Sequence, residues 1–146
     1  MYGDPLTPLE RDVIATILRP VHPVMDALRA QLAVCRTKSR EFTGVGFYTQ
    51  IVVPQALTAA GIDRLTLGDV HADIDGVEHG AGFVLWIDGG MLDTLEGFTY
   101  DEPWPDRIDS FKANPLKIRH AGPSDLEIVD AALHATNVVT PSTQSG

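Results

Sequence analysis

Apolar residues recur at helical spacing along the first third of the chain, beginning near position 9. Thr7 suits a helix N-cap, Pro8 suits the first helical position, and Glu10 stands where a capping box requires it. Pro20 ends this first predicted helix. One face of the helix carries Leu9, Val13, Ile14, Ile17 and Leu18.

A second helix is predicted from about Pro23 to Arg36. Its inner face carries Val24, Met25, Leu28, Leu32 and Cys35. Two helices joined by a short proline-containing link predict a helical hairpin or a sharply kinked pair. We expect this pair to pack against a flat surface.

The period of the pattern then changes from 3.6 to 2. Residues 37–41 (TKSRE) are interpreted as a polar break, and Gln55–Ala60 as a short helical turn. A strand is predicted between them, with one face formed by Val45, Phe47, Thr49, Ile51 and Val53. A second strand covers about 64–75, and its alternation changes phase at Gly68-Asp69, which is typical of a β-bulge.

Residues 81–87 (AGFVLWI) are nearly all apolar and predict a central strand. The turn 88–90 (DGG) leads into a fourth strand over about 91–100. Because short turns leave no room for crossover helices, we expect a four-stranded antiparallel meander. A short extended piece is expected at 116–119, and a capping box at Ser124 and Glu127 predicts a C-terminal helix to about 136.

The sequence therefore predicts an α+β fold with two N-terminal helices, a four-stranded antiparallel meander and a C-terminal helix. The length of 146 residues, with 44% apolar and 21% charged residues, fits one ordinary globular domain. We expect that domain to cover residues 1–140, with 141–146 as a flexible tail.

Charge is distributed unevenly. The net charge is −9, and residues 63–109 hold only Arg64 and Arg107 against twelve carboxylates, a net charge of −10. Such a segment repels nucleic acid and anionic membranes. It would attract a basic protein, although acidic strand faces also serve solubility alone.

Cys35 is the single cysteine, so no internal disulfide can form, which fits a reducing compartment. The N-terminal residues lack a secretory signal pattern, and no apolar stretch is long enough to cross a membrane. We expect a cytoplasmic protein.

His71, Asp73 and Asp75 alternate along one predicted strand and share a face, and the following turn can bring Glu78 and His79 towards them. Imidazole and carboxylate ligands are those that bind zinc and related ions. The metal hypothesis takes His71, Asp73, Glu78 and His79 as ligands. The spacing matches no established metal motif, and solvent-facing strand residues are polar in any case.

The segment 95–105 (LEGFTYDEPWP) combines aromatic rings with carboxylates on a proline-stiffened loop. This composition suits a surface that binds a basic or amphipathic partner. The alternative is that Trp104 folds back to cover the core. The candidate partner-binding residues are Glu96, Phe98, Tyr100, Asp101, Glu102 and Trp104.

Signatures of catalysis are missing from the sequence. Its glycines form no phosphate-binding loop, no nucleophile elbow occurs, and Cys35 falls on an apolar helix stripe. We therefore assign no catalytic residue and no cofactor.

Residues 42–106, with their GF…LEGFTxxExWP block, resemble small uncharacterised bacterial proteins, and the same ending is loosely similar to immunity-type proteins of bacterial competition systems. The resemblance implies no catalytic residues.

Our first hypothesis is a non-enzymatic cytoplasmic binding protein, of the immunity type that the resemblance implies, that presents an acidic, aromatic surface to a basic protein. The alternative is a metal-dependent hydrolase or small-ligand binder that uses the histidine and carboxylate cluster. A third interpretation is a homodimer formed through an unpaired strand.

Overall fold

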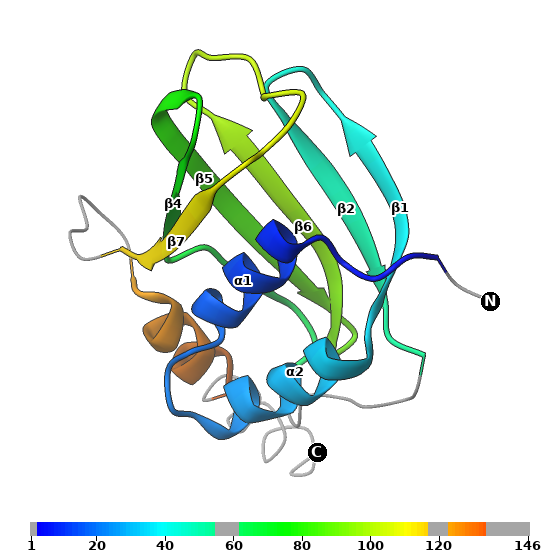
Figure 1. The fold of residues 1–146 in the computed structure, drawn as a ribbon. Helices are drawn as coiled ribbons and strands as arrows, with labels where there is room; N and C mark the ends of the chain where they lie inside the picture. The colour runs from blue at the N-terminus through cyan, green and yellow to red at the C-terminus, as the bar shows by residue number, and fades with distance from the viewer. Residues whose placement is uncertain (1–2, 55–61, 117–122, 134–146) are drawn as a thin grey trace, which may run out of the picture.

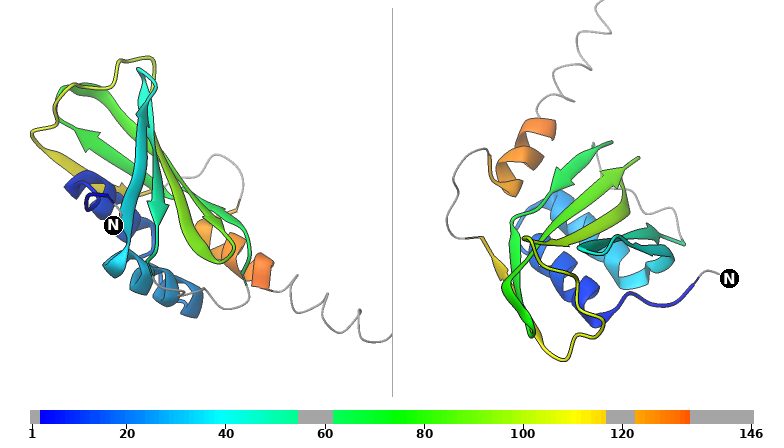
Figure 2. Two further views of the ribbon diagram at one scale, coloured as in Figure 1. Left: turned by 90° about the vertical axis from the view of Figure 1, so that its right-hand side faces the viewer. Right: turned by 90° about the horizontal axis from the view of Figure 1, so that it is seen from above.

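The described part of the chain forms one curved antiparallel sheet with helices against its inner face (Figures 1 and 2). The computed structural model describes residues 3–54, 62–116 and 123–133. Its helices are α1 (Pro8–Ile17), α2 (Pro23–Val34) and a C-terminal helix that begins at Asp125 and continues to the end of the described residues. Its strands are β1 (Arg36–Phe42), β2 (Gly46–Val52), β3 (Leu65–Leu67), β4 (Val70–Ile74), β5 (Val77–Asp88), β6 (Met91–Thr99) and β7 (Phe111–Pro115).

The α+β class, the two N-terminal helices and the C-terminal helix are confirmed, but the four-stranded meander is wrong. The described sheet has seven strands in the order β1-β2-β6-β5-β4-β7, with β3 pairing the far end of β5. Residues 37–41 belong to strand β1, because an edge strand with mostly exposed side chains carries no alternating apolar signal. The predicted strand 64–75 is divided into β3 and β4 at Gly68-Asp69, where the phase change was seen.

The sequence pattern also missed the final strand of the sheet. Strand β7 covers 111–115 and pairs with β4, and the extended piece expected at 116–119 is a separate prediction. Of that expected piece, only Leu116 lies within the described residues. The predicted turn at 55–60, the end of the last helix and the tail also lie outside them.

The predicted meander is also wrong about which strands are neighbours, because β2 pairs with β6 and not with the strand that follows it in the sequence. At this seam, a Cβ on Gly46 would lie 1.9 Å from the carbonyl oxygen of Gly97. Glycine is therefore required at position 46 for the two backbones to approach. The seam joins the β1–β2 hairpin to the β5–β6 hairpin.

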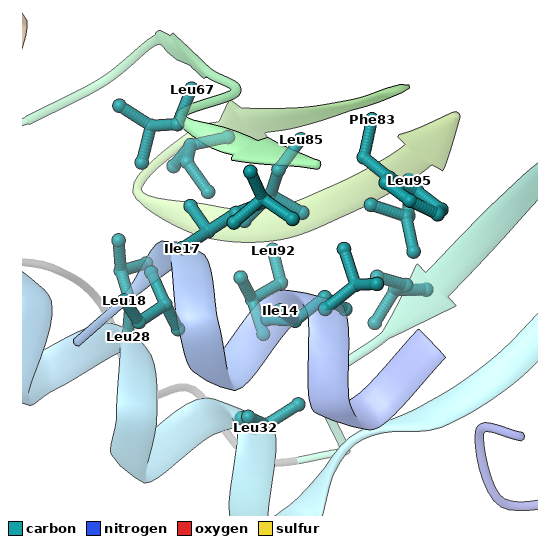
Figure 3. Packing of buried hydrophobic residues seen from close by; sticks show 14 of the residues in the cluster. Ile14, Ile17, Leu18, Leu28, Leu32, Leu67, Phe83, Leu85, Leu92 and Leu95 are labelled. Carbon is teal, nitrogen blue, oxygen red and sulfur yellow. The ribbon is translucent and has the colours of Figure 1, made fainter. Parts of the chain in front are cut away.

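The core lies between the inner face of the sheet and the two N-terminal helices (Figure 3). The predicted helix stripes are buried, and the predicted capping box of Thr7 and Glu10 is present. Cys35 follows α2 and is buried, which raises the pKa of its thiol mainly through desolvation and leaves it unreactive. The sheet side of the core is lined by Phe47, Leu67, Phe83, Leu85, Leu92 and Leu95.

Gln31 fixes α2 to the β5–β6 turn. Its fully buried amide donates to the carbonyl oxygen of Gly90 over 2.9 Å and accepts from the backbone N–H of Leu92 over 2.8 Å. A buried amide is tolerated because both backbone groups of the turn need a partner.

Asp125 fixes the C-terminal helix to the β3–β4 junction. Its carboxylate accepts hydrogen bonds from the backbone N–H groups of Gly68 and Asp69, and Asp69 accepts one from the backbone of Asp125 in return. The capping box predicted at Ser124 and Glu127 is present.

Among the described residues, no helix is long and apolar enough to cross a membrane. Strand β5, which contains 81–87, is central and has partners on both sides. Its edges are therefore not available to a second copy of the chain. Among the described strands, β1, β3 and β7 each pair with one neighbour only and therefore have an edge without a strand partner.

Candidate functional site

The register of the sheet decides which side chains share its outer face, which none of the described helices covers (Figure 2). Residues directly opposite in antiparallel strands lie on the same side. One outer row therefore runs across four strands through Glu41, Tyr48, Glu96 and Val84. This row brings carboxylates from distant parts of the chain to either side of a tyrosine.

A hollow on this face continues the row. It is lined by Tyr48, Trp86 and Asp93, together with Glu41 and the polar side chains of Ser39, Gln50 and Thr94. We call Glu41, Tyr48, Trp86, Asp93 and Glu96 the outer-face patch. The patch combines two aromatic rings with three carboxylates.

The tyrosine of the patch interacts with one of these carboxylates. Its phenol donates a hydrogen bond to Glu96, and this bond, together with the negative charges of Glu96 and Glu41, raises the pKa of Tyr48. Tyr48 keeps 38% of its surface exposed. The ring thus lies beside Glu96 and remains accessible to a partner.

A second outer row lies beside the patch and contains Phe98, Gly82 and His71. The ring of Tyr100 stacks on His71 at 6.4 Å between centroids and meets Phe98 edge-on at 5.7 Å. A Cβ on Gly82 would lie 2.6 Å from the Tyr100 hydroxyl and 2.7 Å from Cζ of Phe98, so this glycine makes room for both rings. Aromatic surface therefore extends from the patch towards β4.

The structure divides the predicted partner-binding residues. Glu96, Phe98 and Tyr100 lie on the outer face. Glu102 instead accepts hydrogen bonds from the backbone N–H groups of Glu78 and His79, which lower the pKa of its carboxyl. Exposed Asp101 adopts a left-handed backbone conformation, with φ of 60°, in the turn after β6.

Trp104 leaves this surface and folds back, as the alternative interpretation expected. Its ring is half-buried against the core and meets Phe47 edge-on, with centroids 5.1 Å apart. The aromatic and acidic segment 95–105 is therefore not one surface.

The residues of the metal hypothesis are brought together only in pairs. His71 Nε2 lies 3.7 Å from Asp73 Oδ1, and His79 Nε2 lies 3.0 Å from Glu78 Oε2. Within the described part of the chain, no group of three or more histidine, cysteine, aspartate or glutamate side chains is placed to hold a metal ion. Asp75 is exposed at the turn between β4 and β5.

A pocket of about 280 Å³ opens on the inner side of the sheet. It lies between the first turn of α1, the end of β1 and the segment 104–111. We call it the inner pocket. Its walls are mainly apolar and come from Pro8, Leu9, Phe42, Phe47, Trp104, Pro105, Ile108 and Phe111, with Thr7, Glu10, Arg40 and Asp106 as the polar members.

Glu10 and Arg40 form an ion pair in this lining. The guanidinium donates from Nε to Oε2 over 2.8 Å and from Nη2 to Oε1 over 2.7 Å. Only 2% of the Glu10 side chain is exposed, and the hydroxyl of Thr49 and the backbone N–H of Thr7 also donate to its carboxylate. Burial acts most strongly and opposes ionisation, but these hydrogen bonds outweigh it and lower the pKa of Glu10.

The inner pocket was missed at the sequence level. Glu10 was interpreted only as a capping residue, and Arg40 was placed in a polar break. A signal did exist, since Thr49 is a polar residue at an inward position of an otherwise apolar strand face. A buried hydroxyl needs a partner, which predicts another polar group nearby but does not say which one.

Comparisons of the chain with protein-family models, with curated proteins and with solved structures gave no match.

Proposed function

We propose that the protein is a non-enzymatic binding module that holds a basic protein partner on the outer-face patch. The observation that carries the proposal is the row Glu41–Tyr48–Glu96, in which an exposed tyrosine lies between two carboxylates on a sheet face left open by the described helices. This role agrees with the similarity of the short segment 95–105 to immunity-type proteins.

Charge supports a basic partner over other classes. The patch holds three carboxylates, and none of its five members is basic. Such a surface repels phosphates and speeds the encounter with lysine-rich or arginine-rich proteins. Arg and Lys side chains can also stack on exposed aromatic rings.

The aromatic side chains provide apolar contact area, which the carboxylates do not provide. Trp86 and Phe98 are partly exposed, and Tyr100 keeps 46% of its surface exposed. Tyrosine and tryptophan are the residues most often found at the energetic centre of protein interfaces. The structure thus favours an interface centred on β2, β5 and β6 over the loop 101–106.

The proposal is tested by capturing partners from a lysate of the source organism on immobilised protein. The test variant is Tyr48→Ser combined with Glu96→Gln. The control variant is Asp12→Asn, which removes the same single charge from an exposed position on α1. We expect a basic protein that binds the parent chain and the control, is lost from the test variant, and is released by salt.

A captured protein that binds the test variant as well as the parent would contradict the proposal. So would binding that is indifferent to salt, because an acidic surface acting on a basic partner must be screened by ions. Thermal unfolding of both variants shows that loss of binding does not come from loss of the fold.

A further inference from the structure

The inner pocket contains hydrogen-bond donors that the fold does not use. Arg40 directs Nε to Glu10 and Thr49, and Nη2 to Glu10 and Thr37. Within the described residues, its Nη1 makes no hydrogen bond. The indole N–H of Trp104 makes none there either.

These two donors are accessible. The described residues contain no buried side-chain nitrogen or oxygen without a hydrogen-bond partner, so both groups reach solvent. Arg40 and Trp104 both line the inner pocket. A molecule in the pocket that carries an acceptor oxygen could therefore satisfy a donor that now faces water.

The charges around the pocket disfavour an anion. The positive charge of Arg40 is already compensated by Glu10, and Asp4 acts on the same guanidinium from outside the pocket lining. Asp106 adds an exposed carboxylate to the lining. An acceptor without charge avoids the repulsion that a carboxylate or phosphate would meet.

The apolar walls and the volume of the inner pocket determine the shape and polarity of the rest of the ligand. Phe47 and Trp104 meet edge-on, and Phe42, Ile108 and Phe111 add further apolar surface. A volume near 280 Å³ is at the small end of ligand pockets. We infer that the inner pocket binds a small, flat, uncharged and largely apolar molecule, such as an aromatic ketone or amide, whose carbonyl oxygen accepts a hydrogen bond from Arg40.

Three matched probes test this assignment in ¹H–¹⁵N correlation spectra of the full chain. Acetophenone carries the ring and the carbonyl, cumene lacks the carbonyl, and benzoate replaces it with an anion. We expect acetophenone to shift the amides of the non-proline residues within 7–10, 40–42 and 104–111 saturably, with a Kd of about 1 mM. Cumene and benzoate should bind about fivefold more weakly or worse, because each lacks the hydrogen bond or meets repulsion.

Two variants locate the site. Ile108→Trp fills the pocket and should abolish the shifts, whereas Val21→Trp adds the same bulk at a position that is 93% exposed and should leave them unchanged. Arg40→Lys should weaken acetophenone but not cumene, and thermal unfolding checks that each variant is folded. If Arg40→Lys does not fold, Ile108→Trp still decides the question.

The assignment is overturned by any of three results. These are the absence of saturable shifts with acetophenone, equal Kd values in Ile108→Trp and the parent chain, and either cumene or benzoate binding as tightly as acetophenone. The outer-face patch takes no part in any of these measurements, so the two proposals stand or fall separately.

Discussion

Glu10 and Arg40 are thirty positions apart in the chain and are joined by two parallel hydrogen bonds of 2.8 and 2.7 Å. The pair ties the first turn of α1 to the edge strand β1. It also sets the orientation of the guanidinium in the inner pocket. One contact thus contributes to both stability and the candidate ligand site.

Glu10→Gln should destabilise the fold by about 3 kcal/mol, because the change leaves Arg40 without its counter-charge. Urea unfolding measures this loss. Asp12→Asn, on the exposed side of the same helix, should stay within about 0.5 kcal/mol of the parent chain. A similar effect of the two changes would show that the ion pair adds nothing.

Low pH should destabilise the fold by protonating the Glu10 carboxylate. The pKa of Glu10 is lowered in the folded protein, so its contribution is present above the ordinary value of 4.5 and is lost as the pH falls through the folded value. The parent chain should therefore lose stability more steeply than Glu10→Gln as the pH decreases below about 4.5. Urea midpoints compared at neutral pH and under acid measure this difference, and parallel curves would contradict it.

Gln31→Leu should cost about 2–4 kcal/mol although the side chain keeps its approximate size. The change leaves the carbonyl of Gly90 and the N–H of Leu92 buried without their present partner. Thermal unfolding measures the cost. Ala30→Gln, on the exposed side of α2, is the control and should change little.

Asp125→Ala should release the C-terminal helix from the β3–β4 junction. Hydrogen exchange is the direct readout, because the amides of Gly68 and Asp69 lose their acceptor and should exchange faster. Glu127→Ala removes the acceptor of the helix cap and should leave those two amides protected. Unchanged exchange in Asp125→Ala would mean that other contacts hold the helix.

Glu96→Gln should bring the pKa of Tyr48 down towards its ordinary value of 10. The carboxylate accepts the phenol's hydrogen bond and repels the phenolate, so its removal favours ionisation. Ultraviolet titration of tyrosine absorbance in the parent and variant measures the shift. Asp63→Asn provides a control of equal charge, and an equal shift there would point to net charge alone.

The sequence predicted the elements whose side chains obey one simple rule. Helix α1 carries a capping box and an apolar stripe, and β5 is apolar enough to be central, so both were found. Strand β1 was missed because an exposed edge strand needs only backbone partners and has no periodic apolar signal. The pairing of β2 with β6 was missed because nothing local in either strand specifies a partner far along the chain.

The candidate site residues divide in the same way. Some could be proposed from their residue type, and others are brought together only by the pairing of distant strands. Glu96, Phe98 and Tyr100 could be proposed from their residue types, and they lie on the outer face. Tyr48 and Trp86 joined them only through register. Trp104 could not be assigned from sequence, since an aromatic beside prolines fits either a contact surface or a cover over the core.

The seam between β2 and β6 sets the order in which this protein can assemble. Each hairpin can close through contacts near in sequence, whereas the seam must join distant residues and is expected to form late. Tyr48 faces Glu96 across that seam, and the pocket residue Phe47 faces Gly97 there. Neither hairpin alone can therefore form the outer-face patch, and a chain arrested during folding would expose two unpaired strand edges while lacking that surface.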